Sequence, residues 1–138
     1  MQAPIAFGNA IADETRFRVI HLLFDRTLCV CELAEILKLP QSTLSSHLKV
    51  IQRADMLDCE RQGKWFFYRV KPGFRPLLQA VFQHFDTTPG TDRTLARDHQ
   101  KATRRIDCRD DTCCPPAATK PAKRPAKSSS RNLKSTTR

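Results

Sequence analysis

The sequence lacks the features that mark secreted and membrane proteins. The residues before Asp13 contain no basic segment followed by an apolar core, so they do not resemble a signal peptide. No apolar run approaches the roughly 18 residues that a membrane-spanning helix needs. These absences predict a cytoplasmic protein without a membrane partner.

Motifs of enzyme chemistry are also missing. The sequence has no acid and base pair, no glycine-rich phosphate loop and no Cys-x-x-Cys motif of the thioredoxin type. An enzyme such as a thiol reductase is therefore disfavoured, no organic cofactor is expected, and assays for turnover should be blank.

Disulfide-type spacing is missing too, although the chain has six cysteines. Two pairs and two single residues make up this set: Cys29 with Cys31, Cys113 with Cys114, Cys59, and Cys108. Such clustering suits soft-metal binding or redox chemistry better than the stapling of a secreted domain. We expect the thiols to be reduced.

Acidic residues are absent from residues 115–138, which contain seven basic groups and supply most of the net charge of +10. Their Pro, Ala, Lys and Ser composition, without an apolar pattern, predicts a disordered basic tail that attracts DNA non-specifically or only aids solubility. Residues 38–71 also have a basic excess, with seven basic and three acidic groups. That excess lies where a DNA-binding surface would need it.

The first half of the chain is patterned for helices. Residues 4–12 are apolar and small enough for a first helix, and Asp13 can cap a second over 13–25. The second helix has one apolar face, formed by Phe17, Ile20, Leu23 and Phe24. Residues 27–39 predict a short helix that ends at Pro40, with Leu33, Ile36 and Leu37 facing inward.

The next helix, over 41–54, has the pattern of a DNA-reading helix. Gln41 or Ser42 caps it, and Leu44, Leu48 and Ile51 form its buried stripe. The opposite face contains Thr43, Ser46, His47, Lys49 and Arg53. In a helix-turn-helix such a face enters the major groove, whereas the plainer alternative is the polar face of any amphipathic helix.

A hairpin over 57–70 favours the DNA-binding interpretation. Its second strand alternates with a period of two, and Gly63 supplies the positive φ of the turn. Arg61 and Lys64 make the tip basic. A basic hairpin directly after a reading helix is typical of a wing that contacts the DNA backbone or minor groove.

The apolar stretch after Gly73 predicts a helix with too much aromatic surface for a domain this small. We expect it to form a subunit interface through Leu78, Val81, Phe82 and Phe85. Residues 91–106 predict one more helix, with Leu95, His99, Ala102 and Ile106 on one side.

Several runs together resemble the arsenic-repressor (ArsR/SmtB) family of winged-helix metalloregulators, in particular its arsenite-responsive branch. They are Ala12-Asp13-Glu14-Thr15-Arg16, Leu28-Cys29-Val30-Cys31-Glu32-Leu33, Ser45-Ser46-His47-Leu48, Arg61-Gln62-Gly63-Lys64-Trp65 and Tyr68-Arg69. The resemblance covers roughly residues 5–85. It implies a homodimeric repressor of double-stranded operator DNA that dissociates when arsenite or antimonite binds its cysteines.

The fold class expected is mainly α with a small β-hairpin, a dimeric winged helix-turn-helix. Residues 1–88 would form the DNA-binding and dimerisation domain, 89–114 a C-terminal extension with a cysteine cluster, and 115–138 the tail. The residues expected to contact DNA are Gln41, Ser42, Thr43, Ser45, Ser46, His47, Lys49, Arg61 and Lys64.

Cys29 and Cys31 are the candidate metal ligands; the alternative is that they are two small buried residues. Residues two apart point about 200° around a regular helix, so this backbone must be non-helical when both sulfurs hold one ion. Thiolates select soft acceptors, and without a nearby histidine they suit a trigonal thiophilic ion better than zinc. Close relatives often have a third cysteine where this chain has Ala34, so the third ligand stays open.

The other cysteines and the histidines have weaker interpretations. Cys108, Cys113 and Cys114 could form a second three-thiol site, send one thiol to the first pair, or have no ligand role. Cys59 is expected to be structural, and His47 to face DNA or cap locally. A metal site at His84, Asp86 and His99 is disfavoured by their spacing. Functionally, the alternative is a redox-responsive DNA-binding repressor that uses no metal.

Overall fold

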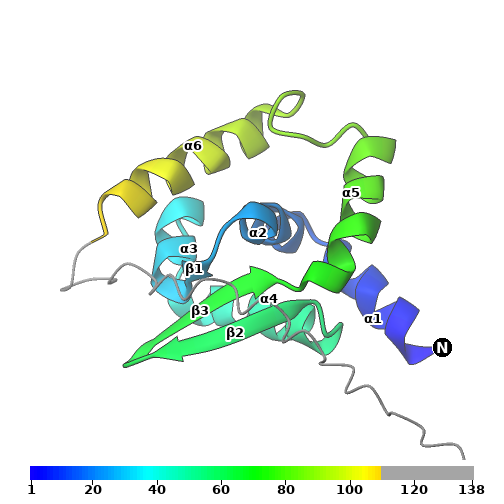
Figure 1. The fold of residues 1–138 in the computed structure, drawn as a ribbon, viewed down its shortest axis with the longest axis horizontal. Coiled ribbons are helices and arrows are strands. Elements are labelled where there is room, and N and C mark those ends of the chain that lie inside the picture. Colours follow the sequence, from blue (N-terminus) through cyan, green and yellow to red (C-terminus); the bar gives the residue numbers. More distant parts are fainter. Residues whose placement is uncertain (110–138) are drawn as a thin grey trace, which may run out of the picture.

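The computed structural model describes residues 1–109 (Figure 1). In chain order its elements are α1 Gln2–Ile11, α2 Glu14–Asp25, β1 Leu28–Cys29, α3 Val30–Leu37, α4 Gln41–Arg53, β2 Leu57–Gln62, β3 Trp65–Val70, the 3-10 turn η1 Pro72–Phe74, α5 Arg75–His84 and α6 Arg93–Asp107. Helix α2 lies at the centre, with the sheet along one side and α6 along the other (Figure 1).

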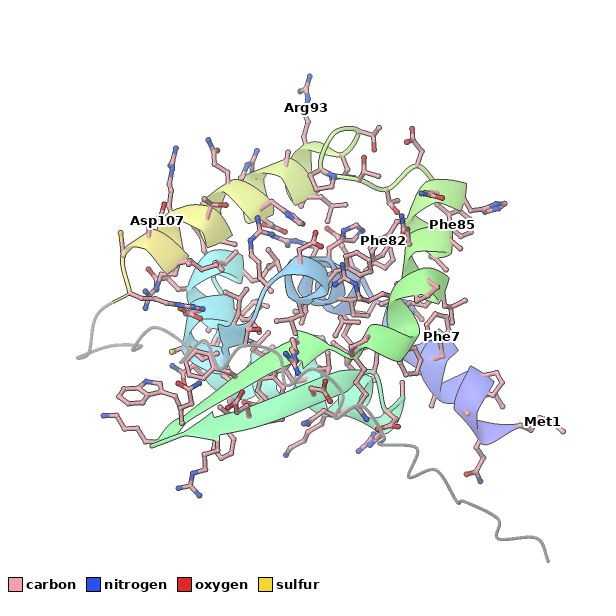
Figure 2. All side chains as sticks on the ribbon, viewed as in Figure 1. Met1, Phe7, Phe82, Phe85, Arg93 and Asp107 are labelled. Atoms are coloured by element: carbon pink, nitrogen blue, oxygen red, sulfur yellow. The ribbon has the colours of Figure 1, made fainter. Side chains whose placement is uncertain are left out.

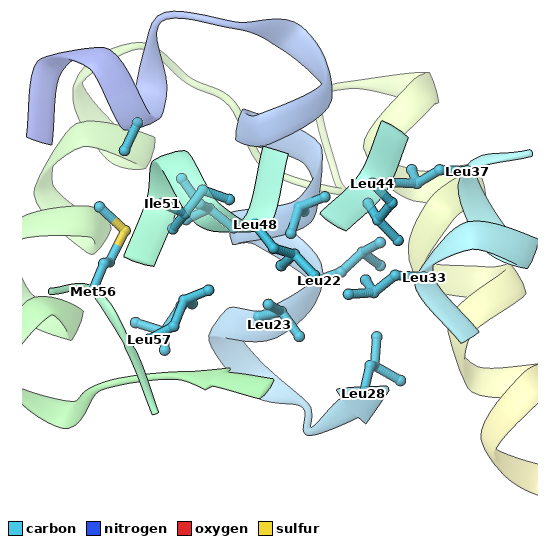
Figure 3. Packing of buried hydrophobic residues seen from close by; sticks show 14 of the residues in the cluster. Leu22, Leu23, Leu28, Leu33, Leu37, Leu44, Leu48, Ile51, Met56 and Leu57 are labelled. Carbon is cyan, nitrogen blue, oxygen red and sulfur yellow. The ribbon is translucent and has the colours of Figure 1, made fainter. Parts of the chain in front are cut away.

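The core forms around α2, as its apolar spacing predicts. Asp13 caps this helix and accepts a hydrogen bond from the Arg16 N–H at 2.9 Å. The hydrogen bond holds the pKa of Asp13 below its usual value. Figure 3 shows leucines of α2 meeting the inward stripe of α4 and the leucines of α3. The predicted stripe of Leu44, Leu48 and Ile51 is confirmed, because all three side chains are buried.

Helices α3 and α4 form the helix-turn-helix, with three corrections to the expected helix ends. The helix expected from residue 27 begins only at Val30, because Leu28 and Cys29 form a short strand paired with β3. It ends at Leu37, where Lys38 takes a left-handed conformation (φ 54°). Pro40, rather than Gln41 or Ser42, is the N-cap of α4 and gives no side-chain hydrogen bond.

The predicted hairpin is confirmed in extent. Leu57 pairs with Val70, Cys59 with Tyr68 and Arg61 with Phe66, and Gly63 turns the chain at φ 58°. The sheet has a third strand that sequence patterning missed, so its order is β1-β3-β2. This added strand attaches the base of the wing to the beginning of α3.

Helix α5 corrects part of the expected interface. Leu78 and Phe82 are buried inside their own chain, where the Phe82 ring stacks on His21 at 3.7 Å between centroids. Figure 2 shows Phe82 on the side of α5 that faces α2. Val81 is half-buried, whereas Leu77 and Phe85 are 48% and 67% exposed. Of the four side chains predicted for the interface, Phe85 and in part Val81 therefore remain available for a partner, whereas Leu78 and Phe82 do not.

Helix α6 packs against α2 and α3, so residues beyond 88 contribute to the same folded unit. Asp98 is buried and forms a two-pronged ion pair with Arg18, at 2.7 and 2.8 Å. Leu95 and Ala102, which were expected on one side of this helix, are buried, and Ile106 packs at the edge of the core. Every helix within residues 1–109 is too short or too polar to cross a membrane.

Candidate functional site

The two neighbouring thiols lie at the junction between β1 and α3. Cys29 has extended backbone angles (φ −88°, ψ 166°), and Cys31 lies in the first turn of the helix. This change of conformation brings their sulfur atoms to 2.6 Å from each other. The prediction that a regular helix cannot place both sulfurs together is consistent with this geometry. No unwinding of α3 is needed to join them, however, because the strand already supplies the extended residue.

The backbone of α3 also interacts with the buried Cys29 sulfur. A capping box closes the helix end: the sulfur accepts from the Glu32 N–H, and the Cys29 N–H donates to Glu32 Oε2 at 3.0 Å. Amide dipoles at a helix N-terminus favour negative charge on a group placed there. The Cys29 sulfur therefore receives a backbone hydrogen bond at the first turn of α3, beside the Cys31 sulfur.

Sequence reasoning missed a buried ion pair behind the thiols. Glu32 is 0% exposed and receives two hydrogen bonds from Arg109, at 2.6 and 2.9 Å. Arg109 also donates to the Thr27 carbonyl at 2.7 Å and lies over the Phe67 ring. One guanidinium group thus joins both sides of the β1–α3 junction to the end of α6. Helical or strand periodicity could not reveal the contact between Glu32 and Arg109, which are 77 residues apart. The position of Glu32, three residues after Cys29, is a sequence signal for the capping box only.

A groove of about 500 Å³ opens beside the thiol pair. Four segments line it: β1 with Cys29, the start of α3 with Val30 and Cys31, α4 with Gln41 and Ser45, and the wing with Lys64, Trp65 and Phe66. Five of these residues were predicted from sequence as separate thiol and DNA-binding features, namely Cys29, Cys31, Gln41, Ser45 and Lys64. The structure brings them to one surface.

Most of the expected DNA-contacting residues lie on accessible surface. On α4, Gln41, Ser42, Thr43, Ser46 and Lys49 are exposed, and Ser45 is half-buried. On the wing, Arg61 and Lys64 are exposed next to aromatic rings, with Arg61 over Phe66 and Lys64 over Trp65.

His47 differs from the rest of that set. Its Nδ1 atom lies 3.5 Å from Arg16 Nη1 and 3.7 Å from Asp13 Oδ1, so the half-buried ring contacts the beginning of α2. A role in positioning α4 against α2 fits these contacts as well as a DNA contact does.

The remaining cysteines do not join the thiol pair in the described part of the chain. Cys108 is exposed at the end of α6 and lines a separate hollow of about 280 Å³ with Lys101 and Arg104. Cys59 is exposed on β2 opposite Tyr68. Burial, together with the nearby Cys59 thiol, raises the pKa of Tyr68 to about 12. Cys113 and Cys114 lie outside the described residues, so their predicted participation is untested.

The histidines also lie apart from a metal-binding arrangement. His99 is half-buried beside Arg26, with 2.8 Å between its Nδ1 and the Arg26 Nη1. Burial and the Arg26 charge lower the pKa of His99. His84 ends α5 and packs on Phe85. Within residues 1–109, no three His, Cys, Asp or Glu side chains gather closely enough to hold an ion.

Comparison with known proteins gives the chain its family. The profile described as "Bacterial regulatory protein, arsR family" matches residues 13–58. Arsenic resistance transcriptional regulator ArsR2 of Pseudomonas putida is 33% identical over 118 residues, which are 83% of this chain and 100% of that protein. The chain belongs to the arsR family. This family consists of transcriptional regulators rather than enzymes, as the missing catalytic motifs predicted.

Other arsR-family relatives match over shorter stretches. Arsenic resistance transcriptional regulator ArsR1 of Pseudomonas putida is 41% identical over 81 residues, 58% of this chain and 62% of that protein. The arsenical resistance operon repressor of Escherichia coli is 39% identical over 70 residues, 50% of this chain and 60% of that protein. The chain thus spans about three fifths of the length of these two relatives.

Solved structures confirm the winged helix-turn-helix fold of this arsR-family chain. HlyU from Vibrio cholerae superposes with a TM-score of 0.56 at 24% identity, covering 62% of this chain and 95% of that one. Mb0332 from Mycobacterium bovis, described as a homodimeric winged helix-turn-helix DNA-binding domain, gives 0.56 at 21% identity, covering 62% and 79%. At these identities the likeness concerns the fold alone.

Proposed function

We propose that this protein is a transcriptional repressor of arsenical resistance that binds operator DNA as a homodimer in the cytoplasm. It leaves the operator when arsenite or antimonite binds the thiolates of Cys29 and Cys31. The observation that supports this proposal most directly is that Cys29 and Cys31 present neighbouring sulfur atoms on a groove shared with α4 and the wing. The names of the arsenic-resistance regulators to which the chain is similar agree with it.

The DNA-binding half of the proposal relies on the exposed face of α4. The first turns of a reading helix contact base edges in the major groove, and here Gln41, Ser42 and Thr43 are exposed. Serine, threonine and glutamine side chains hydrogen-bond to bases, while the cations of the wing bind phosphate without reading sequence. The winged helix therefore has both a specific and a non-specific contact surface.

The inducer half follows from the chemistry of the thiols. Trivalent arsenic and antimony are soft, thiophilic acceptors, and two thiolates offer donors that harder ions such as magnesium do not prefer. An ion held by Cys29 and Cys31 would lie on the groove that Gln41 and Lys64 also line. DNA and metalloid would therefore compete for one surface, so each would weaken the binding of the other.

The dimer is supported by apolar side chains that their own chain leaves uncovered. Leu77 and Phe85 on α5 and Ile5 on α1 are 48%, 67% and 59% exposed. Large apolar groups in this state are typical of a subunit interface. A two-fold dimer would present two α4 helices to half-sites about one DNA turn apart.

A redox switch without metal is the second candidate function. The same 2.6 Å contact between Cys29 and Cys31 favours it, because an oxidant could join two sulfurs that already touch. The two candidates share the DNA-binding surface and differ only in the signal that the thiols receive.

Fluorescence anisotropy on the DNA upstream of the protein's own gene tests the proposal. The full-length protein is bound to this DNA under reducing conditions and titrated in turn with arsenite, antimonite, zinc and peroxide. The proposal expects release by arsenite or antimonite at concentrations where zinc has no effect. Release by peroxide alone would select the redox switch, and absence of binding to this DNA would contradict both.

A further inference from the structure

The groove beside the thiol pair has the size and chemistry of a small-molecule site. We propose that it binds a small anionic monothiol, such as glutathione, whose sulfur becomes the third ligand of the metalloid held by Cys29 and Cys31. This inference rests on the function proposed above and adds a second, organic component to the inducer.

The requirement for a third sulfur comes from the chemistry of trivalent arsenic. Arsenous acid, As(OH)₃, condenses with three thiols, forming three As–S bonds and releasing three water molecules without a change of oxidation state. Cys29 and Cys31 supply two of these sulfurs. Among residues 1–109, no cluster of three metal-binding side chains exists. Ala34 is buried and offers no donor, while Cys59 and Cys108 line other hollows.

The groove can accommodate a molecule the size of a tripeptide. Its volume of about 500 Å³ lies within the range of roughly 300–1,000 Å³ that small-molecule sites occupy. Both sulfur-bearing residues line it, so an occupant and a bound metalloid would be in direct contact. It borders α3, α4 and the wing, which gives it walls on several sides.

The walls match an anionic, peptide-like thiol. Lys64 is exposed with its Nζ atom 4.9 Å from the centre of the Trp65 ring, where it can pair with a carboxylate. Gln41 and Ser45 offer an amide and a hydroxyl for peptide groups, and Trp65 with Phe66 supplies apolar surface. Glutathione combines one thiol, two carboxylates and two peptide groups, so it can use each of these walls.

Such an occupant would also strengthen the release of DNA. Lys64 and Gln41 are among the residues expected to contact the operator, and a carboxylate paired with Lys64 would replace a DNA phosphate there. The thiol therefore adds a steric and electrostatic block to the effect of the metalloid itself.

The test measures arsenite binding by the full-length protein without DNA, in a phosphine reductant that contains no thiol. Equilibrium dialysis gives the arsenite affinity with and without glutathione, and native mass spectrometry identifies the adducts. At glutathione about tenfold above its dissociation constant, arsenite affinity should rise roughly tenfold, and the adduct should contain one arsenic and one glutathione. Lys64→Glu should abolish the gain, while Arg69→Glu, an equal charge change on the same hairpin but outside the groove, should keep it.

Three results would overturn the inference. The first is an arsenite affinity that glutathione leaves unchanged. The second is a gain that Lys64→Glu keeps in full, and the third is an arsenic adduct without glutathione that disappears in Cys113→Ser/Cys114→Ser. In the last case the chain itself supplies the third sulfur, and the proposed function stands. Arsenite binding that survives Cys29→Ser/Cys31→Ser would instead contradict the proposed function.

Discussion

At the scale of single residues, Arg109 and Glu32 decide how the Cys29 and Cys31 thiols are held. The Glu32 carboxylate accepts hydrogen bonds from both the Cys29 N–H and Arg109, and Arg109 also reaches the Thr27 carbonyl. The strand residue and the helix residue that present the sulfurs are thus tied to one buried charge pair. Loss of one partner leaves the other charge buried without compensation, which typically costs about 3–5 kcal/mol.

Arg109→Gln should therefore lower the free energy of unfolding by about 3–5 kcal/mol. Arg105→Gln is the matched control: its partner Glu35 is 64% exposed, so its loss should cost at most about 1 kcal/mol. Both variants can be measured by urea denaturation. The double variant Glu32→Gln/Arg109→Gln should recover part of the loss, because no charge then remains buried. Equal losses in the free energy of unfolding for Arg109→Gln and Arg105→Gln would show that the buried ion pair contributes no more than the exposed one.

His21 gives the protein a pH-dependent stability. Burial lowers its pKa from 6.5 to about 4, and the positive charge of a protonated His99 adds to the shift. Since the unfolded chain binds the proton more readily, this contribution is fully present above pH 6.5 and is lost as the pH falls toward 4. The loss from this group amounts to up to about 3 kcal/mol.

His21→Phe should therefore reduce the loss of stability between pH 7 and pH 4.5. Thermal denaturation across this range measures it, with His84→Phe on the exposed end of α5 as the control. The Phe82 ring, which stacks on His21, offers an aromatic neighbour that a phenylalanine can also pack against. An unchanged pH profile in His21→Phe would assign the acid sensitivity to other groups.

At the scale of elements, α5 has two faces with different roles. Leu78 and Phe82 fill the core of their own chain, whereas Leu77 and Phe85 are exposed. Charges on the exposed face should separate subunits without unfolding them. Charges on the buried face should unfold the chain.

Leu77→Glu/Phe85→Glu should give a folded monomer that has lost operator affinity, since two α4 helices are needed to span the half-sites. Phe82→Glu should instead lose its thermal transition. Analytical ultracentrifugation with circular dichroism distinguishes the two outcomes. A double variant that stays dimeric would place the interface elsewhere. Arg93→Glu on α6, away from α5, is the charge control and should stay dimeric.

The sequence predicts those structural features that residues close together in the chain determine. The cap at Asp13, the stripe of α4 and the turn at Gly63 each follow from spacing within a few residues, and all are confirmed. Strand β1 was missed because two residues show no period, and only pairing with the distant β3 defines it. Phe82 was misassigned because apolar spacing marks a buried face without telling which surface covers it.

The candidate site shows the same limit. Chemistry identified Cys29 and Cys31, and spacing identified α4 and the wing. The common groove and the Arg109 ion pair arise from contacts between segments far apart in the chain. Local sequence periodicity does not indicate contacts between distant segments, so only the three-dimensional structure could reveal them.

At the scale of the whole molecule, one groove connects the thiol pair with the surface expected to bind DNA. The thiols lie where β1 meets α3, and α4 and the wing border the same space. A metalloid on the thiols and DNA on α4 should each weaken the binding of the other, with a coupling free energy of roughly 1–3 kcal/mol or more. The central claim is therefore that Cys29 and Cys31 transmit the inducer signal but are not required for DNA binding.

The direct test is arsenite-driven release of the full-length protein from operator DNA, followed by fluorescence anisotropy. Cys29→Ser and Cys31→Ser should bind the operator as the unchanged protein does, yet remain bound at arsenite concentrations that release it. Cys59→Ser, an exposed cysteine on the wing, should release normally. If Cys29→Ser and Cys31→Ser still release while Cys113→Ser and Cys114→Ser do not, the sensor lies in the C-terminal cysteines and the account is wrong.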